Sequence, residues 1–447
     1  MIKKIVQFYS VLSPKEDLIP LENIKSKYSQ YRWSVFISAT LGYSLYYVCR
    51  LSLSVIKKPL VDANILNESE LGMMGSALFF SYAAGKLFNG FLADKSNIGR
   101  FMSTGLLFSA LINLILGFTS SFIVFTVLWG LSGWFQSMGA APSVISLSRW
   151  FSNKERGTYY GIWSASHSIG KAITYIGVAF MVSVSGWQWG FWGAGLIGLA
   201  GALIIAIFLH DSPESKGLPP VADLKKDYAE KSSKGKSVGV LQKEVLKNPY
   251  IWILAVASCL MYVSRYAIES WGIYYLEAQK GYNTVEASSI LSVSAISGIV
   301  GTVVSGIISD RFFKGSRNVP ALLAGILNVL SISIFLFYPD GNLWVDTLAM
   351  ILFGFAIGIL ITFVGGLMAV DIASKKASGA ALGLIGIASY IGAGVQDIIS
   401  GYLIKNNHTV IDGIDHYDFS TIKIFWIGAA VISVILTLFV WNAKHQD

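Results

Sequence analysis

GAGLIGLAGALIIAIFL, residues 193–209, is a run without one charged side chain. A helix needs about 17–25 such residues to cross the hydrocarbon core of a bilayer. The run GLLFSALINLILGF (105–118) is equally free of charge, and 54% of the 447 residues are hydrophobic while only 13% are charged. Soluble domains carry about 25% charged residues. The sequence therefore predicts an all-α integral membrane protein.

Apolar windows of this kind recur along the chain, without the period-two alternation of a membrane barrel. Twelve predicted transmembrane helices fall at 33–56, 70–93, 101–119, 122–146, 158–184, 190–208, 250–276, 286–309, 320–338, 343–368, 378–404 and 420–441. Six precede and six follow one long polar segment rich in Lys, Ser, Pro and Gly. The predicted organisation is an N-terminal segment, two six-helix bundles joined by a linker, and a tail, at 1–32, 33–208, 209–249, 250–441 and 442–447.

The net charge of +8 is distributed unevenly over the predicted loops. With both termini placed inside, 25 of the 34 Lys and Arg residues lie on the cytoplasmic side and five on the other, among them Lys57 and Lys58. This asymmetry follows the positive-inside rule, so the basic character needs no nucleic-acid partner. The N-terminus lacks the pattern of a cleaved secretory signal. We expect a multi-pass protein of the inner (plasma) membrane with cytoplasmic termini.

Two sequence repeats support the division into halves. GFLADKSNIGR (90–100) and GIISDRFFKGSR (306–317) share the pattern G-x-x-x-D-[K/R] followed by a basic residue. The loop residues that we expect to act in conformational change are Asp94, Lys95, Arg100, Asp310 and Arg311. Farther along, three glycines recur in the second half at one constant spacing, as Gly157/Gly379, Gly161/Gly383 and Gly170/Gly392. Duplicated halves with a substrate site at their interface are typical of transporters.

Arg50, in YYVCRLSLSV (46–55), and Arg265, in CLMYVSRYAIESW (259–271), occupy equivalent places in the first helix of each half. Away from the ends of the predicted spans, the other charged residues and the one histidine are Lys86, His167, Lys171, Glu269 and Asp397. A charge at mid-membrane costs about 2.5–3.5 kcal/mol and needs a partner or a wet cavity. Four cations against two anions leave two positive charges, which a phosphate dianion neutralises, and the arginine fork binds phosphate oxygens bidentately.

Each of these charges also has a structural interpretation. Arg265 lies one turn from Glu269 and could simply pair with it, and Lys86 lies close enough to a helix end to snorkel. His167 and Lys171 share one helix face. Asp397 either neutralises Lys86 or Lys171 or accepts hydroxyls from a sugar. The aromatic residues that either line a pocket or anchor helices at the interface are Tyr47, Tyr262, Trp271 and Tyr274.

Several kinds of chemistry have no sequence signal here. The chain has no phosphate-binding loop, no nucleophile elbow and no Cys/His cluster, so we expect no enzyme activity, no cofactor and no metal. Cys49 and Cys259 both fall inside predicted spans, which argues against a structural disulfide.

Longer segments resemble the organophosphate:phosphate antiporters of the major facilitator superfamily, and most closely their hexose-phosphate branch. They are YYVCR, SYAAGKLFNGFLADKS (81–96), SRWFSNKERGTYYGIWSASHSIG (148–170) and NPYIWILAVASCLMYVSRYAIESWGIYYL (248–276). The resemblance implies that Arg50 and Arg265 clamp the phosphate and that His167 and Lys86 belong to the site. Leu51, Lys171 and Asp397 depart from residues common in that family, which leaves the organic part of the substrate open.

The leading hypothesis is exchange of a phosphorylated sugar, glucose 6-phosphate or another hexose phosphate, for inorganic phosphate by alternating access. The expected partners are these small molecules and the lipid bilayer, and the expected state is a monomer. Two alternatives remain open. One is a membrane sensor that binds a sugar phosphate, and the other is a proton-coupled symporter in which His167, Glu269 or Asp397 titrates.

Overall fold

A computed structural model describes residues 2–15, 19–225, 238–313, 316–338, 341–373, 377–412 and 414–443. The helices of the first half are α2 (Leu21–Asp62), α3 (Glu68–Asp94), α4 (Ile98–Leu116), α5 (Phe122–Gln136), α6 (Ala140–Trp150), α7 (Asn153–Ser164), α8 (Ser166–Ile173), η1 (Thr174–Val178), α9 (Ala179–Ser185) and α10 (Gln188–Phe208). Those of the second half are α13 (Pro249–Lys280), α14 (Thr284–Ile307), η3 (Ile308–Phe312), α15 (Asn318–Phe337), α16 (Leu343–Thr362), η4 (Phe363–Leu367), α17 (Met368–Ile372), α18 (Ser378–Asn406) and α19 (Ser420–Phe439). The remaining elements are α1 (Ile2–Tyr9), η2 (Glu214–Lys216), α11 (Val221–Lys225), α12 (Val238–Lys247), β1 (His408–Ile411) and β2 (Ile414–Tyr417).

The all-α membrane prediction is confirmed. In the described part of the chain, ten helical segments are long and apolar enough to cross a bilayer, several of them built from consecutive helices such as α5 and α6. The more polar helices α2 and α3 occupy the first two predicted windows. α2 has 42 residues, because its polar first turns extend the helix beyond the apolar window that the sequence indicated.

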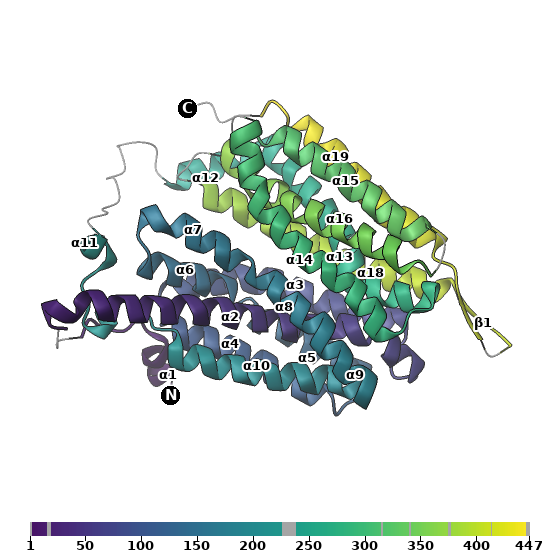
Figure 1. Cartoon of the computed structure of the whole chain (residues 1–447), viewed down its shortest axis with the longest axis horizontal. Coiled ribbons are helices and arrows are strands. Elements are labelled where there is room, and N and C mark those ends of the chain that lie inside the picture. Colours follow the sequence, from purple (N-terminus) through teal and green to yellow (C-terminus); the bar gives the residue numbers. More distant parts are fainter. Residues whose placement is uncertain are drawn as a thin grey trace.

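The two halves form two bundles that lie side by side (Figure 1). They approach each other at the end where α3, α13 and α18 meet, and they diverge toward the end that carries α7, α11 and α12. Across the interface α3 packs on α18 and α2 packs on α13. The core lies inside each bundle and along this contact, and the outward-facing helix surfaces are apolar, as a lipid-facing surface requires.

The internal repeat is also a repeat of helix packing. A Cβ added to Gly170 would lie 2.2 Å from the carbonyl oxygen of Ser44, and one added to Gly392 would lie 2.4 Å from that of Cys259. Ser44 and Cys259 have the same sequence separation as the two arginines. Each half therefore brings its fifth transmembrane segment against its first at an equivalent glycine, which permits close backbone approach.

The loop motif of the first half contacts the N-terminal segment. Arg100 donates to the carbonyl oxygen of Phe8 at 2.8 Å, and its guanidinium lies 4.7 Å from the centroid of the Phe8 ring. Arg149 donates to the backbone carbonyl of Asp94 at 3.4 Å, while the side chains of Asp94 and Lys95 are exposed. In the second half Arg311 is exposed and the side chain of Asp310 lies outside the described residues.

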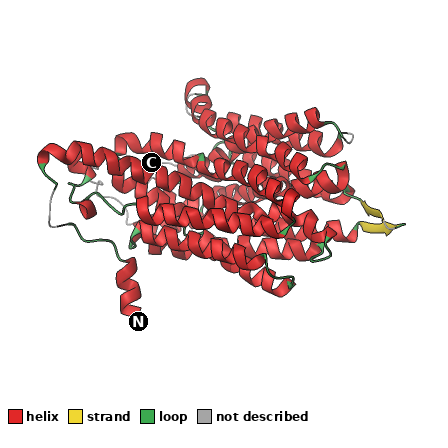
Figure 2. Cartoon of the chain, turned by 60° about the horizontal axis from the view of Figure 1, so that its bottom comes forward, coloured by secondary structure: helices red, strands yellow, loops and turns green. Residues whose placement is uncertain are grey.

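A small β-hairpin was not predicted. Strands β1 and β2 pair antiparallel with His408 opposite Tyr417, and Figure 2 shows the hairpin projecting from one end of the helices. Asp412, in the connection, adopts a left-handed conformation with φ 53°. Asp tolerates this region better than most residues.

Candidate substrate site

Arg50 lies in α2, is 4% exposed, and rests between two aromatic rings. Its guanidinium carbon is 4.1 Å from the centroid of the Tyr82 ring and 4.9 Å from that of Tyr47. Among the described residues, Nε and Nη1 of this side chain have no hydrogen-bond partner. A buried donor without a partner is costly, so these two groups are suited to bind an anion.

Arg265 lies at the equivalent place in α13 and is 3% exposed. Its guanidinium carbon is 5.2 Å from the ring centroid of Tyr262 and 5.0 Å from that of Tyr266. Nε donates to Oε1 of Glu269 at 2.9 Å, and Nη2 has no partner among the described residues. The ion pair with Glu269 and a free donor therefore occur on the same side chain.

Glu269 connects the two halves electrostatically. The same oxygen, Oε1, also accepts a hydrogen bond from Lys171 of α8, and the backbone carbonyl of Glu269 accepts from the Tyr175 hydroxyl at 3.2 Å. Glu269 lines the cavity that contains Arg50 and also a second cavity lined by His167 and Lys171. One carboxylate is thus shared by two cations and borders both cavities.

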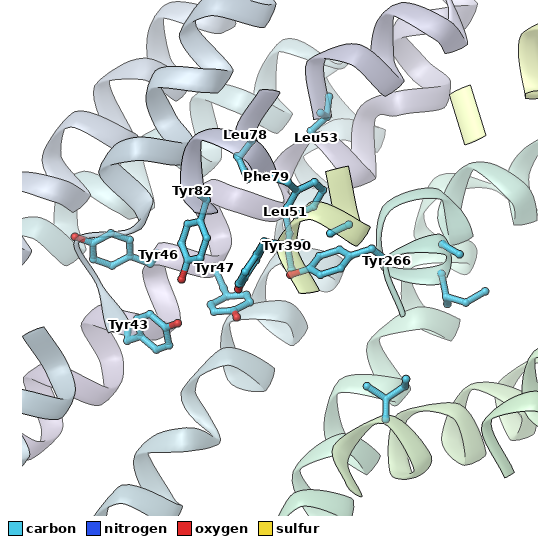
Figure 3. Packing of buried hydrophobic residues seen from close by; sticks show 14 of the residues in the cluster. Tyr43, Tyr46, Tyr47, Leu51, Leu53, Leu78, Phe79, Tyr82, Tyr266 and Tyr390 are labelled. Carbon is cyan, nitrogen blue, oxygen red and sulfur yellow. The ribbon is translucent and has the colours of Figure 1, made fainter. Parts of the chain in front are cut away.

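Aromatic side chains from both halves surround the arginines. Figure 3 shows Tyr47, Tyr82, Tyr266 and Tyr390 converging from different helices. The ring centroids of Tyr82 and Tyr390 are 4.5 Å apart. Those of Phe79 and Tyr266 are 4.6 Å apart. Both pairs join α3 to helices of the second half. These rings therefore form an aromatic contact between the two bundles.

Asp397 pairs with neither Lys86 nor Lys171, so the first of its two sequence interpretations is wrong. Its Oδ1 accepts from Lys57 at 3.3 Å, from Ser270 at 2.7 Å and from the Trp271 indole at 2.6 Å. The prediction that Lys57 lies in an outer loop is also wrong, because α2 continues to Asp62 and keeps Lys57 buried at 1% exposure. The sequence Lys57-Lys58-Pro59 is typical of the end of a helix, which is why the predicted span stopped before it.

The other predicted site residues make contacts with aromatic rings, backbone carbonyls and a carboxylate. The His167 ring is 5.8 Å from that of Tyr47, and its Nδ1 contacts the carbonyl oxygen of Ser164. Lys86 is exposed, with Nζ 5.6 Å from the Tyr390 ring centroid. Tyr274 donates to Glu68 at 2.8 Å. Tyr274 thus joins α13 to α3 of the first half, and the centroid of the Trp271 ring lies 3.5 Å from Nζ of Lys57 in α2.

Sequence reasoning missed several contributors. Lys57 follows Arg50 by two helical turns. If the helix is extended past residue 56, this spacing predicts that both side chains lie on the same face. Tyr82 and Tyr390 had no signal that places them beside the arginines, because their proximity depends on how α3 and α18 pack, whereas Tyr266 directly follows Arg265 in the sequence.

The charge balance of the site favours an anionic ligand. Asp397 is neutralised by Lys57, which leaves Arg50, Arg265 and Lys171 around Glu269. Three positive charges facing one negative charge leave an excess of two, and a low-dielectric interior makes that excess costly. Each bundle contributes one buried arginine, and the interface between two such halves is where secondary transporters typically have their substrate site.

Comparisons with known proteins agree with this class. Residues 39–396 match the Major Facilitator Superfamily. The chain is 32% identical to a probable hexose phosphate transport protein of Chlamydia pneumoniae, covering 95% of this chain and 94% of the relative. It is 30% identical to the glycerol-3-phosphate transporter of Bacillus subtilis (98% and 99% covered) and 31% identical to the membrane sensor protein UhpC of Salmonella typhimurium (83% and 85%).

The chain therefore belongs to the Major Facilitator Superfamily and, within it, to the organophosphate:phosphate antiporter family. Solved structures support the fold. An inward-facing, unoccupied bacterial homologue of the human lysosomal transporter Spinster has a TM-score of 0.70 at 18% identity, covering 92% of this chain and 97% of that one. A mutant of the nucleoside transporter NupG has a TM-score of 0.71 at 16% identity, covering 92% and 100%. The fold and the relatives are those of transporters, not of enzymes.

Proposed function

We propose that this protein exchanges a phosphorylated sugar, a hexose phosphate such as glucose 6-phosphate, for inorganic phosphate by alternating access. The observation that carries the proposal is the pair of buried guanidinium groups, one from each half, with donors that remain unpartnered among the described residues. Arg50 and Arg265 would hold the phosphoryl group, and other residues that line the two cavities bordered by Glu269 would contact the organic part. Relatives named for hexose phosphate and glycerol 3-phosphate transport support a phosphate-bearing substrate.

The charge excess gives exchange a physical cause. In the empty carrier Glu269 neutralises only part of the charge of Arg265 and Lys171, and Arg50 has no carboxylate partner among the described residues. Closing the two bundles around this excess is unfavourable in a low-dielectric interior. A bound phosphate brings about two negative charges and removes it. The loaded carrier therefore changes conformation readily and the empty one does not.

The domain arrangement and topology belong to the same proposal. The two bundles, 33–208 and 250–441, move against each other. The linker 209–249, the N-terminal segment 1–32 and the tail 442–447 face the cytoplasm. The charge asymmetry of the loops supports this orientation in an inner membrane. Residues 226–237 of the linker and 444–447 of the tail lie outside the described residues. We propose that the protein acts as a monomer, because each chain holds both arginines.

The test is counterflow in proteoliposomes. Vesicles loaded with inorganic phosphate should take up labelled glucose 6-phosphate rapidly, whereas vesicles without internal phosphate should not. Equal uptake by both preparations contradicts exchange. Uptake that needs no internal phosphate and is abolished by a protonophore identifies proton-coupled symport instead. Glycerol 3-phosphate and 3-phosphoglycerate, tested in parallel, define the organic half of the substrate.

A second candidate function is sensing, which the 31% identity to a membrane sensor protein favours. A sensor should bind the sugar phosphate without measurable counterflow. Binding measured on the purified protein together with counterflow on the same preparation separates the two functions.

A further inference from the structure

Each half contains one fully buried asparagine in its third transmembrane helix. Asn113 in α4 is 0% exposed and Asn328 in α15 is 2% exposed. Their separation in the sequence is the same as that between Arg50 and Arg265, so they occupy equivalent places in the two halves. A buried amide in an apolar bundle is unfavourable unless it is hydrogen-bonded, so the contacts of these two side chains need a reason.

In the first half the amide holds the turn of α2 that bears the arginine. Nδ2 of Asn113 donates to the carbonyl oxygen of Cys49 at 3.1 Å, and Oδ1 accepts from the Ser52 hydroxyl at 2.9 Å. Cys49 immediately precedes Arg50, and Ser52 lies one turn after Cys49 on the same helix face. Asn113 is thus hydrogen-bonded to α2 at two residues that flank Arg50 in the sequence.

In the second half the equivalent amide makes only part of this contact. Nδ2 of Asn328 donates to the hydroxyl of Ser264 at 3.2 Å, and Ser264 immediately precedes Arg265. Oδ1 of Asn328 has no partner among the described residues. The residue equivalent to Ser52 in the second half is Ala267, which has no hydroxyl to donate. Two side chains therefore distinguish the halves: Ala267 in place of Ser52 leaves Oδ1 without a donor, and Ser264 in place of Cys49 offers its hydroxyl to Nδ2.

We propose that Asn113 and Asn328 are positioning residues that set the rotation of α2 and α13, and so the direction of the two guanidinium groups. This rests on the proposed function, in which Arg50 and Arg265 share one phosphate. Helices in lipid associate through close packing and interhelical hydrogen bonds, and a hydrogen bond adds a directional contact to that packing. Because successive residues differ by about 100° around a helix, holding the face at Cys49 also sets the direction of Arg50.

The experiment measures the dissociation constant for inorganic phosphate and the thermal unfolding midpoint of the phosphate-free full chain in detergent. Asn113→Leu and Asn328→Leu keep the size of the side chain but remove its hydrogen bonds. Asn328→Leu should weaken phosphate binding by about three- to twenty-fold, the range expected for loss of one intramembrane hydrogen bond, and Asn113→Leu by at least as much, because it loses two hydrogen bonds to α2. The unfolding midpoint should not fall in parallel, because leucine suits an apolar environment.

Ser109→Ala and Ser331→Ala are the matched controls. Both serines are fully buried, and each hydroxyl donates at 2.9 Å to a backbone carbonyl of its own helix, that of Gly105 for Ser109 and that of Asn328 for Ser331, so neither hydroxyl is bonded to an asparagine side chain. They should leave phosphate affinity within about twofold of wild type. Asparagine variants that bind phosphate as tightly as these controls overturn the proposal, as does a loss of affinity that tracks loss of thermal stability in all four variants.

Ala267→Ser keeps the test decisive if a leucine variant does not fold. It supplies the donor that Asn328 lacks, so phosphate binding should tighten by up to about threefold, and Ser52→Ala should weaken it by a similar factor. No change in either variant contradicts the positioning role. A wild-type chain that binds no phosphate contradicts the proposed function as well, which distinguishes the two failures.

Discussion

At the residue scale, the two arginines differ in what surrounds them. Both lie against tyrosine rings, but Arg265 is paired with Glu269, whereas Arg50 keeps two donors without partners in the described part of the chain. A phosphate bound as proposed would therefore gain new hydrogen bonds mainly at Arg50 and would compete with a resident carboxylate at Arg265. The halves are equivalent in sequence position but unequal in charge.

Replacing Arg50 or Arg265 by lysine should weaken phosphate binding by about ten- to hundred-fold, because an ammonium cannot reproduce the planar bidentate fork. Phosphate titration of the purified variants and counterflow in loaded vesicles measure the effect. Arg32→Lys, in the partly exposed pair with Glu155, is the control and should leave both unchanged. Wild-type affinity in both Arg→Lys variants would remove the arginines from the site.

Glu269→Gln should destabilise the phosphate-free protein by about 3–5 kcal/mol, because it leaves buried Arg265 and Lys171 without their shared anion. Added phosphate should recover much of that loss by supplying negative charge. Thermal unfolding with and without phosphate measures both effects. Glu155→Gln removes a carboxylate that is 30% exposed and should cost about 1 kcal/mol or less. Similar losses in the two variants would contradict the buried cluster.

At the element scale, only some of the repeated glycines are needed for packing. Gly170 and Gly392 each face a backbone carbonyl of the first helix of their half. For Gly157, Gly161, Gly379 and Gly383 a Cβ would meet nothing within 4 Å. The sequence repeat marks equivalent positions, but helix packing decides which of them cannot accept a side chain.

Gly170→Ala should therefore destabilise the protein by about 1–3 kcal/mol, because α8 must move away from α2. Gly161→Ala on the same segment should be neutral or stabilising by up to about 1 kcal/mol, since alanine is the better helix former. Gly392→Ala and Gly383→Ala form the same comparison in the second half. Thermal unfolding of the four variants provides the measurement, and equal effects within each pair would be inconsistent with the observed crossings.

At the scale of the whole molecule, Lys57, near the C-terminal end of α2, and Asp397, in α18, join the two bundles. Both side chains of the pair are about 1% exposed. Ser270 and Trp271 donate hydrogen bonds to the same oxygen of Asp397. Any conformation that separates α2 from α18 at this level has to break the pair. The contact is thus suited to stabilise the conformation in which this end is closed.

Asp397→Asn should shift the protein toward opening at this end, because it leaves Lys57 buried without its anion. Ser54, which lines the cavity with Arg50 and Asp397, is replaced by cysteine in a chain whose two native cysteines are removed. Its labelling by an impermeant thiol reagent, added from the side opposite the linker, should become about ten-fold faster or more.

The double variant Lys57→Met/Asp397→Leu should return labelling toward the wild-type rate, because no unpaired charge remains. Asp346→Asn is the matched control, since Asp346 forms an equally buried pair with Lys280 inside the second half alone. It should lower stability without changing the labelling rate. Faster labelling in this control as well would show that the effect is general loosening rather than loss of a contact between the halves.

The sequence alone determined the twelve helices, the two halves and the equivalent arginines, because uncharged runs, loop charges and repeat spacings are properties of the chain itself. The tertiary structure alone decided that Lys57 rather than Lys86 neutralises Asp397, and that Lys171 shares Glu269 with Arg265. It also decided which tyrosines surround Arg50. These contacts join helices that are distant in the sequence. Which side chains meet depends on where two helices cross, and small residues permit a close crossing but no local sequence pattern encodes its position.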